Sequence, residues 1–566
     1  MRTAIISNSK LKGRAYAGTY VVALAWDFVS SAASNRKDLL GFAIERTQLK
    51  NGSIVEKYWI KGIKRFKDKD IGLDPGTPVP TSEHPVQSFQ WCDYTAKENH
   101  QYQYRIVPAY GSNPKLIDLE EANALVIPIK TESEMGNATT ASTSGVRHDL
   151  FFNRGVIGSQ AYAREFKNAA PDADDPTSRE MVWLSRGLFE ALLRFISLAK
   201  NEKYSLRAAL YEFHYLPVAI AFATAAEAGA DVKIVYDGES SYKVENLKTI
   251  QAAKLDMIDA VKARTVTEGI RHNKFIVLLE NKKPVAVWTG STNISASGIF
   301  GHSNVGHIIW DADIAQSYLD YWDRLYQNLT PTKLRPLNKT ASPVPAGKPA
   351  KKSITPVFSP RDTETENSTL QWYADLMDGA KKLMCITIAF NLDEVFQEVI
   401  QKQNDVLRYI VKDDNLSNNE IIGQDRDVLF AAGGYFGSDS LFNFRTERGN
   451  PLSSNDYIHN KFMLIDPLGK DPIVVTGSAN FSRPSQRIND ENMVVIRGDT
   501  RIADIYFGEF MRIFDHHYAR YISRILKQQN QNDPNAGYLK PDNSWTTSHF
   551  DSNSYKSKRR KYFVSG

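Results

Sequence analysis

Short alternations of hydrophobic and polar residues dominate the first part of the chain. Residues 21–26 and 41–46 are mainly apolar runs of strand length, and residues 102–106 alternate between large hydrophobic and polar side chains. This period of two fits β-strands better than helices. Short strands divided by polar turns are typical of two packed antiparallel sheets. We therefore predict an all-β sandwich over residues 1–130.

The pattern changes to α/β character farther along the chain. Residues 188–196 and 219–228 have the apolar spacing of helices, whereas residues 206–213 and 232–237 are mainly apolar runs of strand length. This order predicts a β-α-β unit. The same order returns in the second half, which indicates that a whole lobe is duplicated. There we expect helices at 370–381 and 394–403, and strands at 383–390 and 407–413.

Shifts in composition mark the boundaries between these parts. Residues 131–147 are rich in Ser, Thr, Glu, Gly and Asn, and residues 331–356 are rich in Pro, Lys, Thr and Ala, as expected of linkers. The basic run 556–561 indicates a solvated end that could also contact nucleic acid or anionic lipid. The predicted fold is multidomain: a β-sandwich (1–130), a linker (131–147), α/β lobe 1 (148–330), a linker (331–356), α/β lobe 2 (357–530) and a basic, flexible tail (531–566).

Composition limits the class of protein without naming a substrate. The 566 residues suffice for three or four domains, and the 42% hydrophobic content allows each a core. The net charge of +5 is far from that of a dedicated nucleic-acid-binding domain. Two cysteines exclude a disulfide framework and favour a cytoplasmic location. We expect neither a secretory signal nor a membrane span, because no apolar run is long enough.

The strongest chemical signal is a two-part motif that occurs twice. Its first part is the tripeptide His-Asn-Lys, and the two copies start 187 residues apart. Its second part is Gly-Ser-x-Asn, which begins 18 residues after the His in both copies. Such agreement in content and spacing is hard to produce by chance. The copies are His272-Asn273-Lys274 with Gly290-Ser291-Thr292-Asn293, and His459-Asn460-Lys461 with Gly477-Ser478-Ala479-Asn480.

The position of each motif beside apolar strands predicts a shared site. Each tripeptide leads into an apolar strand, at 275–279 and 462–465, so its His and Lys should share one face. A second strand, at 285–289 or 473–476, ends at the glycine and presents Ser and Asn as hydrogen-bond donors. Two lobes facing each other then supply two imidazoles, two ammonium groups and two carboxamides. This set suits a phosphodiester and requires no metal or cofactor.

These motifs resemble those of the phospholipase D superfamily over about residues 150–525. The family pattern is His-x-Lys, four residues, Asp, and then Gly-Ser-x-Asn. The second copy fits it completely, with Asp466 at the acidic position, whereas the first copy has Leu279 there. The resemblance implies two duplicated lobes packed about a pseudo-twofold axis, a covalent phosphohistidine intermediate and no metal. It also implies that the histidine of the first motif, His272, is the nucleophile.

A second asymmetry bears on the roles of the two histidines. Eleven residues after each motif Asn, the family places an acidic residue that orients the histidine of that lobe. Here lobe 2 has Glu491 and lobe 1 has Asn304. Because a carboxylate stabilises imidazolium, we expect Glu491 to keep His459 protonated as the general acid, and His272 to be neutral. The catalytic set is His272, Lys274, Asn293, His459, Lys461, Asn480 and Glu491, supported by Ser291, Ser478, Asp466 and Asn304.

Several of these residues could have a structural role instead of a catalytic one. Asp466 has the position of a residue that caps a turn at a strand end. His214, His302 and His307 are interpreted as structural residues. The loss of an acidic residue at both Leu279 and Asn304 also leaves room for a first lobe that no longer supports catalysis.

The N-terminal segment carries a resemblance of its own. Trp26, the strand at 41–46 and the later strand around Tyr102 are similar to those of fibronectin type III modules, with Tyr102 as the candidate tyrosine corner. This resemblance implies a spacer, or a docking module for a protein partner, rather than chemistry.

Three functions remain open from the sequence. Fusion of both lobes in one chain favours a monomeric phospholipase D that releases a phospholipid head group. The basic run at 556–561, and the lack of an obvious membrane-binding amphipathic helix, favour a nuclease or nucleic-acid end-processing phosphodiesterase. The altered first motif, with Leu279 and Asn304, is also similar to that of tyrosyl-DNA phosphodiesterases. A catalytically inactive protein that binds anions or recruits a partner is the third possibility.

Overall fold

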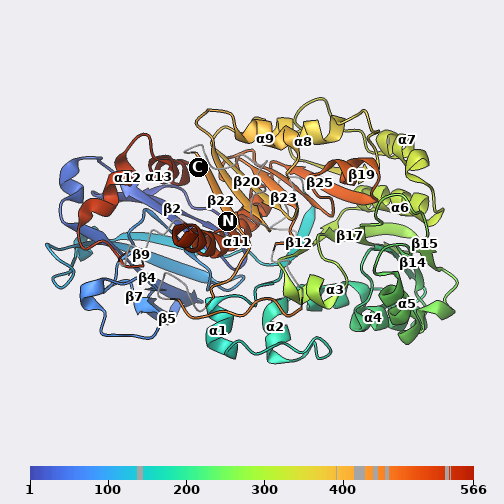
Figure 1. Cartoon of the computed structure of the whole chain (residues 1–566), viewed down its shortest axis with the longest axis horizontal. Coiled ribbons are helices and arrows are strands. Elements are labelled where there is room, and N and C mark those ends of the chain that lie inside the picture. Colours follow the sequence, from blue (N-terminus) through green and yellow to red (C-terminus); the bar gives the residue numbers. More distant parts are fainter. Residues whose placement is uncertain are drawn as a thin grey trace.

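Three parts of the chain pack side by side in the computed structural model. It describes residues 1–136, 145–390, 392–413, 427–437, 444–452, 458–528, 535 and 537–566. The N-terminal β-rich part, in blue, lies at one end and the first α/β lobe, in green, at the other (Figure 1). The second α/β lobe, in yellow to red, lies next to both.

The N-terminal part consists of antiparallel sheets. One sheet has the order β1-β2-β3-β8 and the other has the order β10-β9-β4-β5, with β11 also paired to β9. The core between them contains Trp26, Phe42 and Tyr104. The strands are β1 (Ile6–Ser7), β2 (Leu11–Ala17), β3 (Val22–Phe28), β4 (Leu39–Lys50), β5 (Ser53–Trp59), β8 (Gln90–Asp93), β9 (Gln101–Tyr110), β10 (Asp118–Leu119) and β11 (Leu125–Lys130), with a small β6–β7 hairpin (Lys61–Gly62, Val79–Pro80).

Tyr102 behaves locally as a tyrosine corner would. Its phenol oxygen accepts a hydrogen bond from the backbone N–H of Lys97, five residues earlier, at 2.9 Å. The ring is buried in the core of the N-terminal part. The sandwich fold class predicted from alternation is therefore confirmed, while the finer fibronectin type III assignment stays a prediction.

Lobe 1 contains a seven-stranded mixed sheet. Its order is β12-β18-β17-β16-β13-β14-β15, in which β13, β14 and β15 run parallel and the other pairings are antiparallel. The strands are β12 (Arg147–Phe152), β13 (Tyr204–Leu210), β14 (Asp231–Asp237), β15 (Val261–Arg264), β16 (Lys274–Glu280), β17 (Lys283–Gly290) and β18 (Val305–Trp310).

Lobe 2 repeats this sheet strand for strand. Its order is β19-β25-β24-β23-β20-β21-β22, again with three parallel strands at one side. Identical order in both lobes confirms the predicted duplication and the fold class built on it. The strands are β19 (Ser353–Ser359), β20 (Leu383–Ile388), β21 (Leu407–Lys412), β22 (Val428–Ala432), β23 (Phe462–Ile465), β24 (Ile473–Gly477) and β25 (Glu491–Arg497).

Helices cover both faces of the two sheets. Strands buried on both faces need apolar residues at successive positions, which explains the continuous runs in the sequence. The helices are α1 (Gln160–Phe166), α2 (Arg179–Ser185), α3 (Leu188–Ile196), α4 (Leu216–Glu227), α5 (Lys243–Ala252), α6 (Ala312–Tyr326), α7 (Pro331–Ala341), α8 (Ser368–Asp378), α9 (Glu394–Ile400), α10 (Arg483–Arg487), α11 (Thr500–Gln528), α12 (Thr547–Phe550) and α13 (Tyr555–Ser565). Short helical turns are η1 (Ala33–Arg36), η2 (Lys67–Lys69), η3 (Glu121–Asn123), η4 (Leu255–Met257), η5 (Ser297–Gly301) and η6 (Asn543–Thr546).

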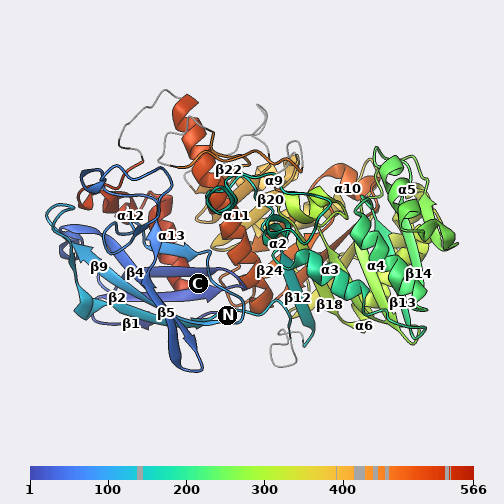
Figure 2. The same ribbon diagram turned by 90° about the horizontal axis from the view of Figure 1, so that it is seen from below.

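The long helix α11 connects all three parts. Its 29 residues run between the N-terminal part and the lobes (Figure 2). Phe507, Phe510 and Phe514 lie in one hydrophobic core with residues of both sheets, such as Phe275 of β16 and Phe462 of β23. The two lobes therefore share one hydrophobic core and are not structurally separate. Among the described residues, none of the helices combines the length and the apolar character that a membrane-spanning segment needs.

Two segments differ from the expected linkers and tail. The second expected linker, 331–356, contains helix α7, in which Leu334 is fully buried, and it ends within β19. Of the first, residues 137–144 lie outside the described part of the chain.

The expected flexible tail is ordered over residues 537–566, where α12 and α13 pack on the N-terminal sandwich. Arg560 pairs with the buried Asp27 and lies 4.0 Å from the ring centre of Phe550. The basic run is therefore held by buried acidic and aromatic partners, which its charge alone did not reveal.

Candidate active site

The two His-Asn-Lys tripeptides lie at corresponding places in the two sheets. The first precedes and enters β16, and the second immediately precedes β23. Each tripeptide thus leads into an apolar strand, as predicted, and each histidine lies just before that strand. Each lysine ammonium turns back to its own tripeptide: Nζ of Lys274 donates to the carbonyl of His272 at 2.6 Å, and Nζ of Lys461 to that of His459 at 2.8 Å.

Each imidazole is held by a side chain of the opposite lobe. Nδ1 of His272, in lobe 1, donates to Oε2 of Glu491 in lobe 2 at 2.8 Å. Nδ1 of His459, in lobe 2, donates to Oδ1 of Asn304 in lobe 1 at 3.0 Å. Both pairs are buried, and each imidazole keeps 6% of its surface exposed, so neither is sealed from solvent. The predicted pseudo-twofold arrangement brings the two motifs to one site.

This exchange corrects the predicted partners of the histidines. Glu491 was expected to orient His459 of its own lobe, and Asn304 to orient His272; the structure pairs them the other way round. The physical reason is the packing of the lobes, because Asn304 and Glu491 each stand immediately before or at the start of a strand, β18 or β25, that faces the other lobe. Glu491 therefore does not keep His459 protonated, and the predicted partnership of these two residues is wrong.

The motif serines hold the residues that orient the imidazoles. The hydroxyl of Ser478 donates to Oε2 of Glu491 at 2.8 Å, and that of Ser291 donates to Oδ1 of Asn304 at 2.8 Å. Ser485, which the sequence reasoning missed, adds a hydroxyl to the other oxygen of Glu491 at 3.0 Å. Ser291 and Ser478 thus support the residues that orient the imidazoles, in keeping with their prediction as supporting residues.

The motif asparagines lie at the ends of β17 and β24. Asn293 donates through Nδ2 to Oε1 of Glu212 at 2.6 Å, and Ser295 donates to the other oxygen of Glu212 at 2.6 Å. Among the described residues, no hydrogen-bond partner lies against Oδ1 of Asn293 or of Asn480. Glu212 was missed by the sequence reasoning. The sequence feature that could have identified it is an acidic residue at the end of the mainly apolar run 206–213.

Glycine is required where each Gly-Ser-x-Asn begins. Gly290 has φ of 133° and Gly477 has φ of 158°. A Cβ on Gly290 would lie 2.2 Å from the carbonyl oxygen of Val305, and one on Gly477 would lie 2.2 Å from that of Asn492. The close approach of neighbouring strands therefore excludes any side chain at these two positions.

Burial shifts the protonation of the whole site. Desolvation lowers the pKa of His272 to about 4, although Glu491 opposes this change. It lowers the pKa of His459 well below the ordinary value, helped by the positive charge of Lys461. Desolvation also lowers the pKa of Lys274 to about 8, against the attraction of Glu491 and Glu212. The free protein therefore holds both imidazoles neutral at pH 7, and an anionic group would oppose that effect.

Aromatic rings surround both imidazoles. The ring of Tyr211 packs edge-on to that of His272, with centroids 4.9 Å apart, and lies 5.2 Å from Nζ of Lys274. The ring of His302 lies 4.6 Å from that of His459, and its Nδ1 accepts from Nδ2 of Asn304 at 3.0 Å. His302 was interpreted as structural, but it contacts the site.

The structure places Asp466 away from the imidazoles. His459 precedes β23, whereas Asp466 follows its other end. Its carboxylate accepts from the backbone N–H groups of Lys381 and Lys382 at 2.8 Å and of Leu383 at 3.2 Å. Asp466 therefore fastens a loop, as its structural interpretation predicted, and does not support the site directly. The absence of an acid at Leu279 removes only the corresponding fastening in lobe 1.

One known protein family matches a segment in each of the two lobes. The family described as "Cardiolipin synthase, PLD-like domain" matches residues 192–326 and 431–515. The first segment contains the whole first motif, and the second segment contains the whole second motif. No curated protein sequence shows significant similarity to this chain.

Several solved structures are similar to this chain at low sequence identity and with TM-scores below 0.5. Phosphatidylserine synthase from Haemophilus influenzae is 14% identical, with 62% of this chain and 93% of that chain covered and a TM-score of 0.41. A yeast tyrosyl-DNA phosphodiesterase mutant is 14% identical, with 55% and 86% covered and a TM-score of 0.32. Polyphosphate kinase from Porphyromonas gingivalis is 11% identical, with 61% of this chain covered and a TM-score of 0.39; the match spans only 54% of that kinase.

Proposed function

Since both lobes carry phospholipase D-like segments, we propose that this protein is a metal-independent phosphodiesterase that forms a phosphohistidine intermediate. One observation carries the proposal: the lobes exchange side chains so that His272 and His459 are oriented at one buried site by Glu491 and Asn304. Lys274 and Lys461 supply positive charge beside them. This set fits a phosphodiester, whose charge is spread over its non-bridging oxygens.

His272 is the proposed nucleophile. Its Nδ1–H donates to the carboxylate of Glu491, which leaves the lone pair of Nε2 for attack on phosphorus. The new N–P bond forms as the P–O bond to the leaving group breaks. The carboxylate stabilises the positive charge that develops on the imidazole. His272 thus keeps the role proposed from the sequence, but with a carboxylate partner instead of an amide.

His459 is the proposed general acid. Its amide partner Asn304 orients the ring without stabilising its positive charge as a carboxylate would, so the protonated ring is a strong proton donor. The anionic substrate, held by Lys274 and Lys461, favours that protonated state. His459 gives its proton to the leaving oxygen. It then takes a proton from the water that attacks phosphorus and breaks the N–P bond.

Trapping the intermediate tests these roles. The protein reacts briefly with a phosphodiester labelled on phosphorus and is then denatured in alkali. Label should remain on the wild type. More label should remain on His459→Asn, because hydrolysis of the phosphohistidine then lacks its general base. His272→Ala should carry none. Label on His272→Ala, or none on either of the other two proteins while product forms, would reject the assignment.

A phospholipid is the substrate that we propose. Four large apolar side chains are exposed at the start of α4 and α5, which pack against each other and follow the parallel strands at the edge of the sheet where His272 lies. Exposed apolar side chains beside a polar site suit a lipid surface. They are Leu216, Ile220, Val244 and Leu247, with exposed fractions of 40%, 47%, 49% and 44%.

A nucleic acid is the second candidate, on a different observation. Tyr211 lies edge-on to Tyr242 with ring centroids 5.6 Å apart, and His214 stacks on Tyr242 at 5.4 Å. Tyr211 also touches His272. Aromatic rings beside a catalytic site are suited to stacking on bases, so this cluster favours a nuclease or an end-processing enzyme.

Parallel assays separate the candidates. The purified protein is incubated in EDTA with phosphatidylcholine vesicles, single- and double-stranded DNA, and RNA. Head-group release without nucleic-acid cleavage supports the lipid proposal; cleavage alone supports the second candidate. No turnover of any of these substrates favours the inactive anion-binding protein. Loss of activity in EDTA contradicts the metal-free mechanism.

A surface variant sharpens the lipid arm. The double variant Val244→Ser with Leu247→Ser should lower turnover of vesicles roughly tenfold, because each side chain loses part of its burial in lipid. Its turnover of a short-chain monomeric phospholipid should not change. Leu337→Ser on α7, equally exposed at 45%, is the matched control and should leave both unchanged.

The other parts of the proposal concern the whole chain. The N-terminal sandwich (1–130) serves as a spacer or docks a protein partner, and one chain supplies a complete site as a monomer in the cytoplasm. The shared core of the two lobes supports the monomer. A mass measurement in solution that gives only dimers would contradict it.

A further inference from the structure

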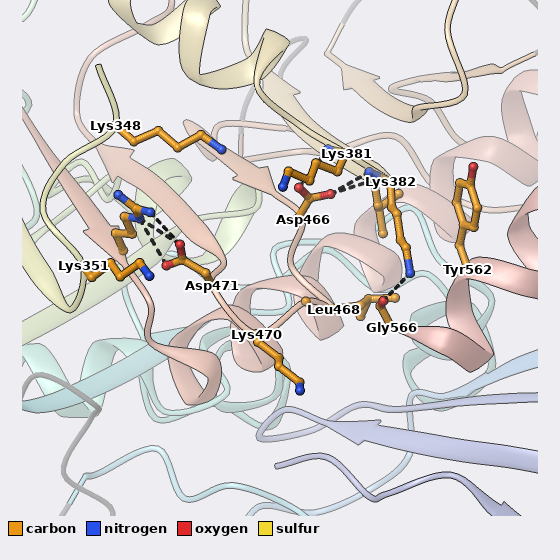
Figure 3. Close-up of a pocket in the computed structure, with 13 residues that line it drawn as sticks. Lys348, Lys351, Lys381, Lys382, Asp466, Leu468, Lys470, Asp471, Tyr562 and Gly566 are labelled. Atoms are coloured by element: carbon orange, nitrogen blue, oxygen red, sulfur yellow. Dashed lines mark hydrogen bonds and ion pairs between the residues drawn. The ribbon is translucent and has the colours of Figure 1, made fainter. Parts of the chain in front are cut away.

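A second basic site lies at the far end of lobe 2. A cavity of about 470 Å³ opens there, lined by residues from five separate regions of the sequence (Figure 3). Lysines reach it from the segment before β19, the start of β20 and the loop after β23. The lining residues are Lys348, Lys351, Lys381, Lys382, Leu383, Asp466, Leu468, Gly469, Lys470, Asp471, Arg497, Tyr562 and Gly566.

The cavity is separate from the proposed catalytic site. Strand β23 lies between them, with His459 before it and Asp466, a lining residue, after it. Seven residue steps of about 3.3 Å each place these two residues roughly 20 Å apart along the chain direction. None of the motif histidines or lysines lines the cavity. Its charge therefore serves something other than the reacting phosphodiester.

Positive charge dominates the cavity wall. Five lysines and Arg497 face two acidic side chains, and both of these are engaged. Asp466 accepts from backbone N–H groups, and Asp471 pairs with Arg497 at 2.6 Å. Arg497, followed by Lys351 and Lys348, holds the pKa of the Asp471 carboxyl below its ordinary value. The wall thus keeps a surplus of cations.

Three of these cations take no part in the fold. Among the described residues, the ammonium groups of Lys351, Lys381 and Lys470 have no hydrogen-bond or ion-pair partner, and all three side chains are exposed. The other two lysines are tethered: Nζ of Lys382 donates to the carbonyl of Gly566 at 2.8 Å, and Nζ of Lys348 to that of Gly379 at 3.2 Å. In Figure 3, Lys348 and Lys381 extend toward each other across the cavity.

We propose that this cavity binds a ligand that carries two or more phosphate groups. Lysines from separate segments, each with free N–H donors, match phosphate oxygens at several points at once. Their mutual repulsion falls when an anion lies between them. A cavity of this size holds a small molecule, whereas a single phosphate would meet only part of the wall. A free polyphosphorylated molecule and the head group of a phosphorylated lipid share this chemistry.

Binding there would tighten the junction of the three parts of the protein. The loop that forms the floor is held by the N-terminal residue Arg2, whose Nη1 donates to the carbonyls of Leu468 at 2.9 Å and Gly469 at 2.6 Å. Arg2 also pairs with Asp504 of α11. Gly566, which follows α13, lines another side. A ligand that bridges these elements should raise the melting temperature.

Titration calorimetry with inorganic tripolyphosphate tests the proposal. The wild type should bind it, and the triple variant Lys351→Gln, Lys381→Gln, Lys470→Gln should bind at least about tenfold more weakly. The matched control, Lys248→Gln, Lys283→Gln, Lys333→Gln, removes the same charge from exposed lysines elsewhere and should keep the wild-type affinity. Equal affinity in all three proteins, or equal losses in both variants, rules out a free polyphosphate as the ligand and leaves a lipid head group as the only form of the proposal still to be tested.

Two further arms identify the source of the phosphates and isolate this site. The first arm measures binding of the protein to vesicles that contain phosphatidylinositol bisphosphate and to vesicles of phosphatidylcholine alone. If only binding to the first kind of vesicle depends on the three lysines, the ligand is a lipid head group. Dependence of tripolyphosphate binding reports a free ligand. Lys461→Gln, in the proposed catalytic site, should leave the cavity's affinity unchanged. The inference therefore survives even if the protein turns over no phosphodiester, and fails if neither arm depends on the lysines.

Discussion

Single side chains at the centre of the molecule act across the boundary between the lobes. His272 depends on Glu491, which comes from the other half of the chain and is itself held by Ser478 and Ser485. His459 depends on Asn304, which Ser291 holds. The two halves of the site thus have the same design, but one ends in a carboxylate and the other in an amide. That single difference distinguishes the two imidazoles electrostatically.

Removing the charge of Glu491 should therefore affect the first chemical step. Glu491→Gln keeps the shape of the side chain but no longer stabilises positive charge on His272, and we expect kcat to fall by roughly 100-fold or more. Steady-state kinetics on a chromogenic phosphodiester measure this effect. Asn304→Asp is the companion variant, which gives His459 a carboxylate and should make it a weaker acid. An unchanged kcat in Glu491→Gln would refute the proposed partnership.

The pKa values at the site predict a window of activity. His272, the proposed nucleophile, has a pKa of about 4 and must be neutral to attack, so its protonation limits kcat/KM only as the pH approaches about 4. Burial lowers the pKa of His459 well below 6.5 and that of Lys274 to about 8, and both must be protonated, the first to donate its proton and the second to hold phosphate. We therefore expect kcat/KM to fall as the pH rises, and to fall more steeply above about pH 8. A pH profile of kcat/KM tests both limits. Lys274→Arg should move the alkaline limit upward, because guanidinium stays charged.

The same shifts affect stability with a definite sign. The folded pKa of His272 is lower than its ordinary 6.5, and that of Lys274 is lower than its ordinary 10.5. The unfolded chain therefore binds more protons between pH 4 and 6.5 and between pH 8 and 10.5. Through these two groups, folding stability rises with pH in both windows. The site carries an unfavourable folding contribution at acidic pH.

At the scale of elements, alternate residues of the central strands enter different cores. Phe275 and Val277 of β16 face the core that contains α11, whereas Ile276 and Leu278 face the core built with α3 and α4. Both faces of the sheet are covered, so β16 is apolar at successive positions. This strand positions the first His-Asn-Lys tripeptide at its start.

Asp466 shows how an element is fastened at its other end. Asp466→Ala leaves three backbone N–H groups, those of residues 381–383, without their acceptor. We expect a loss of about 1–3 kcal/mol in the free energy of unfolding, measured by urea denaturation. The kcat should stay the same, because the carboxylate is remote from the imidazoles. A large fall in kcat at unchanged stability would show that Asp466 supports the site after all.

At the scale of the whole molecule, buried polar contacts join the lobes in addition to their shared core. Arg264 of lobe 1 donates to Asp490 of lobe 2 at 3.0 Å and to the carbonyl of Leu329 at 2.7 Å. Both charged side chains are almost fully buried. The neighbouring residue, Glu491, is the partner of His272, so this ion pair lies next in the sequence to the contact that orients His272.

Breaking this pair should destabilise the protein strongly. Arg264→Ala leaves Asp490 buried without its cation, and we expect a loss of about 3–5 kcal/mol in the free energy of unfolding. Arg179→Ala is the control, since Arg179 pairs with Glu165 while 80% exposed, and its loss should stay below about 1 kcal/mol. Thermal and chemical denaturation measure both. Similar losses in the two variants would contradict a structural role for the buried pair.

The sequence by itself determined the local elements and the chemical groups of the site. Apolar periodicity predicted α3 and the start of the β-α-β unit, and the duplicated motif identified the histidines, lysines and asparagines, because these patterns depend on neighbours within one segment. It did not reveal that Glu212 and His302 lie in the site, or that residues 537–566 pack on the sandwich.

Only the tertiary structure decided which lobe orients which imidazole. His272 and Glu491 are 219 residues apart, and no spacing rule links them. Their contact depends on how two similar sheets meet about the pseudo-twofold axis, and that is set by the packing of α11 and the shared core. The same packing places Arg560 of α13 against Asp27 and Phe550, where its charge is used within the fold.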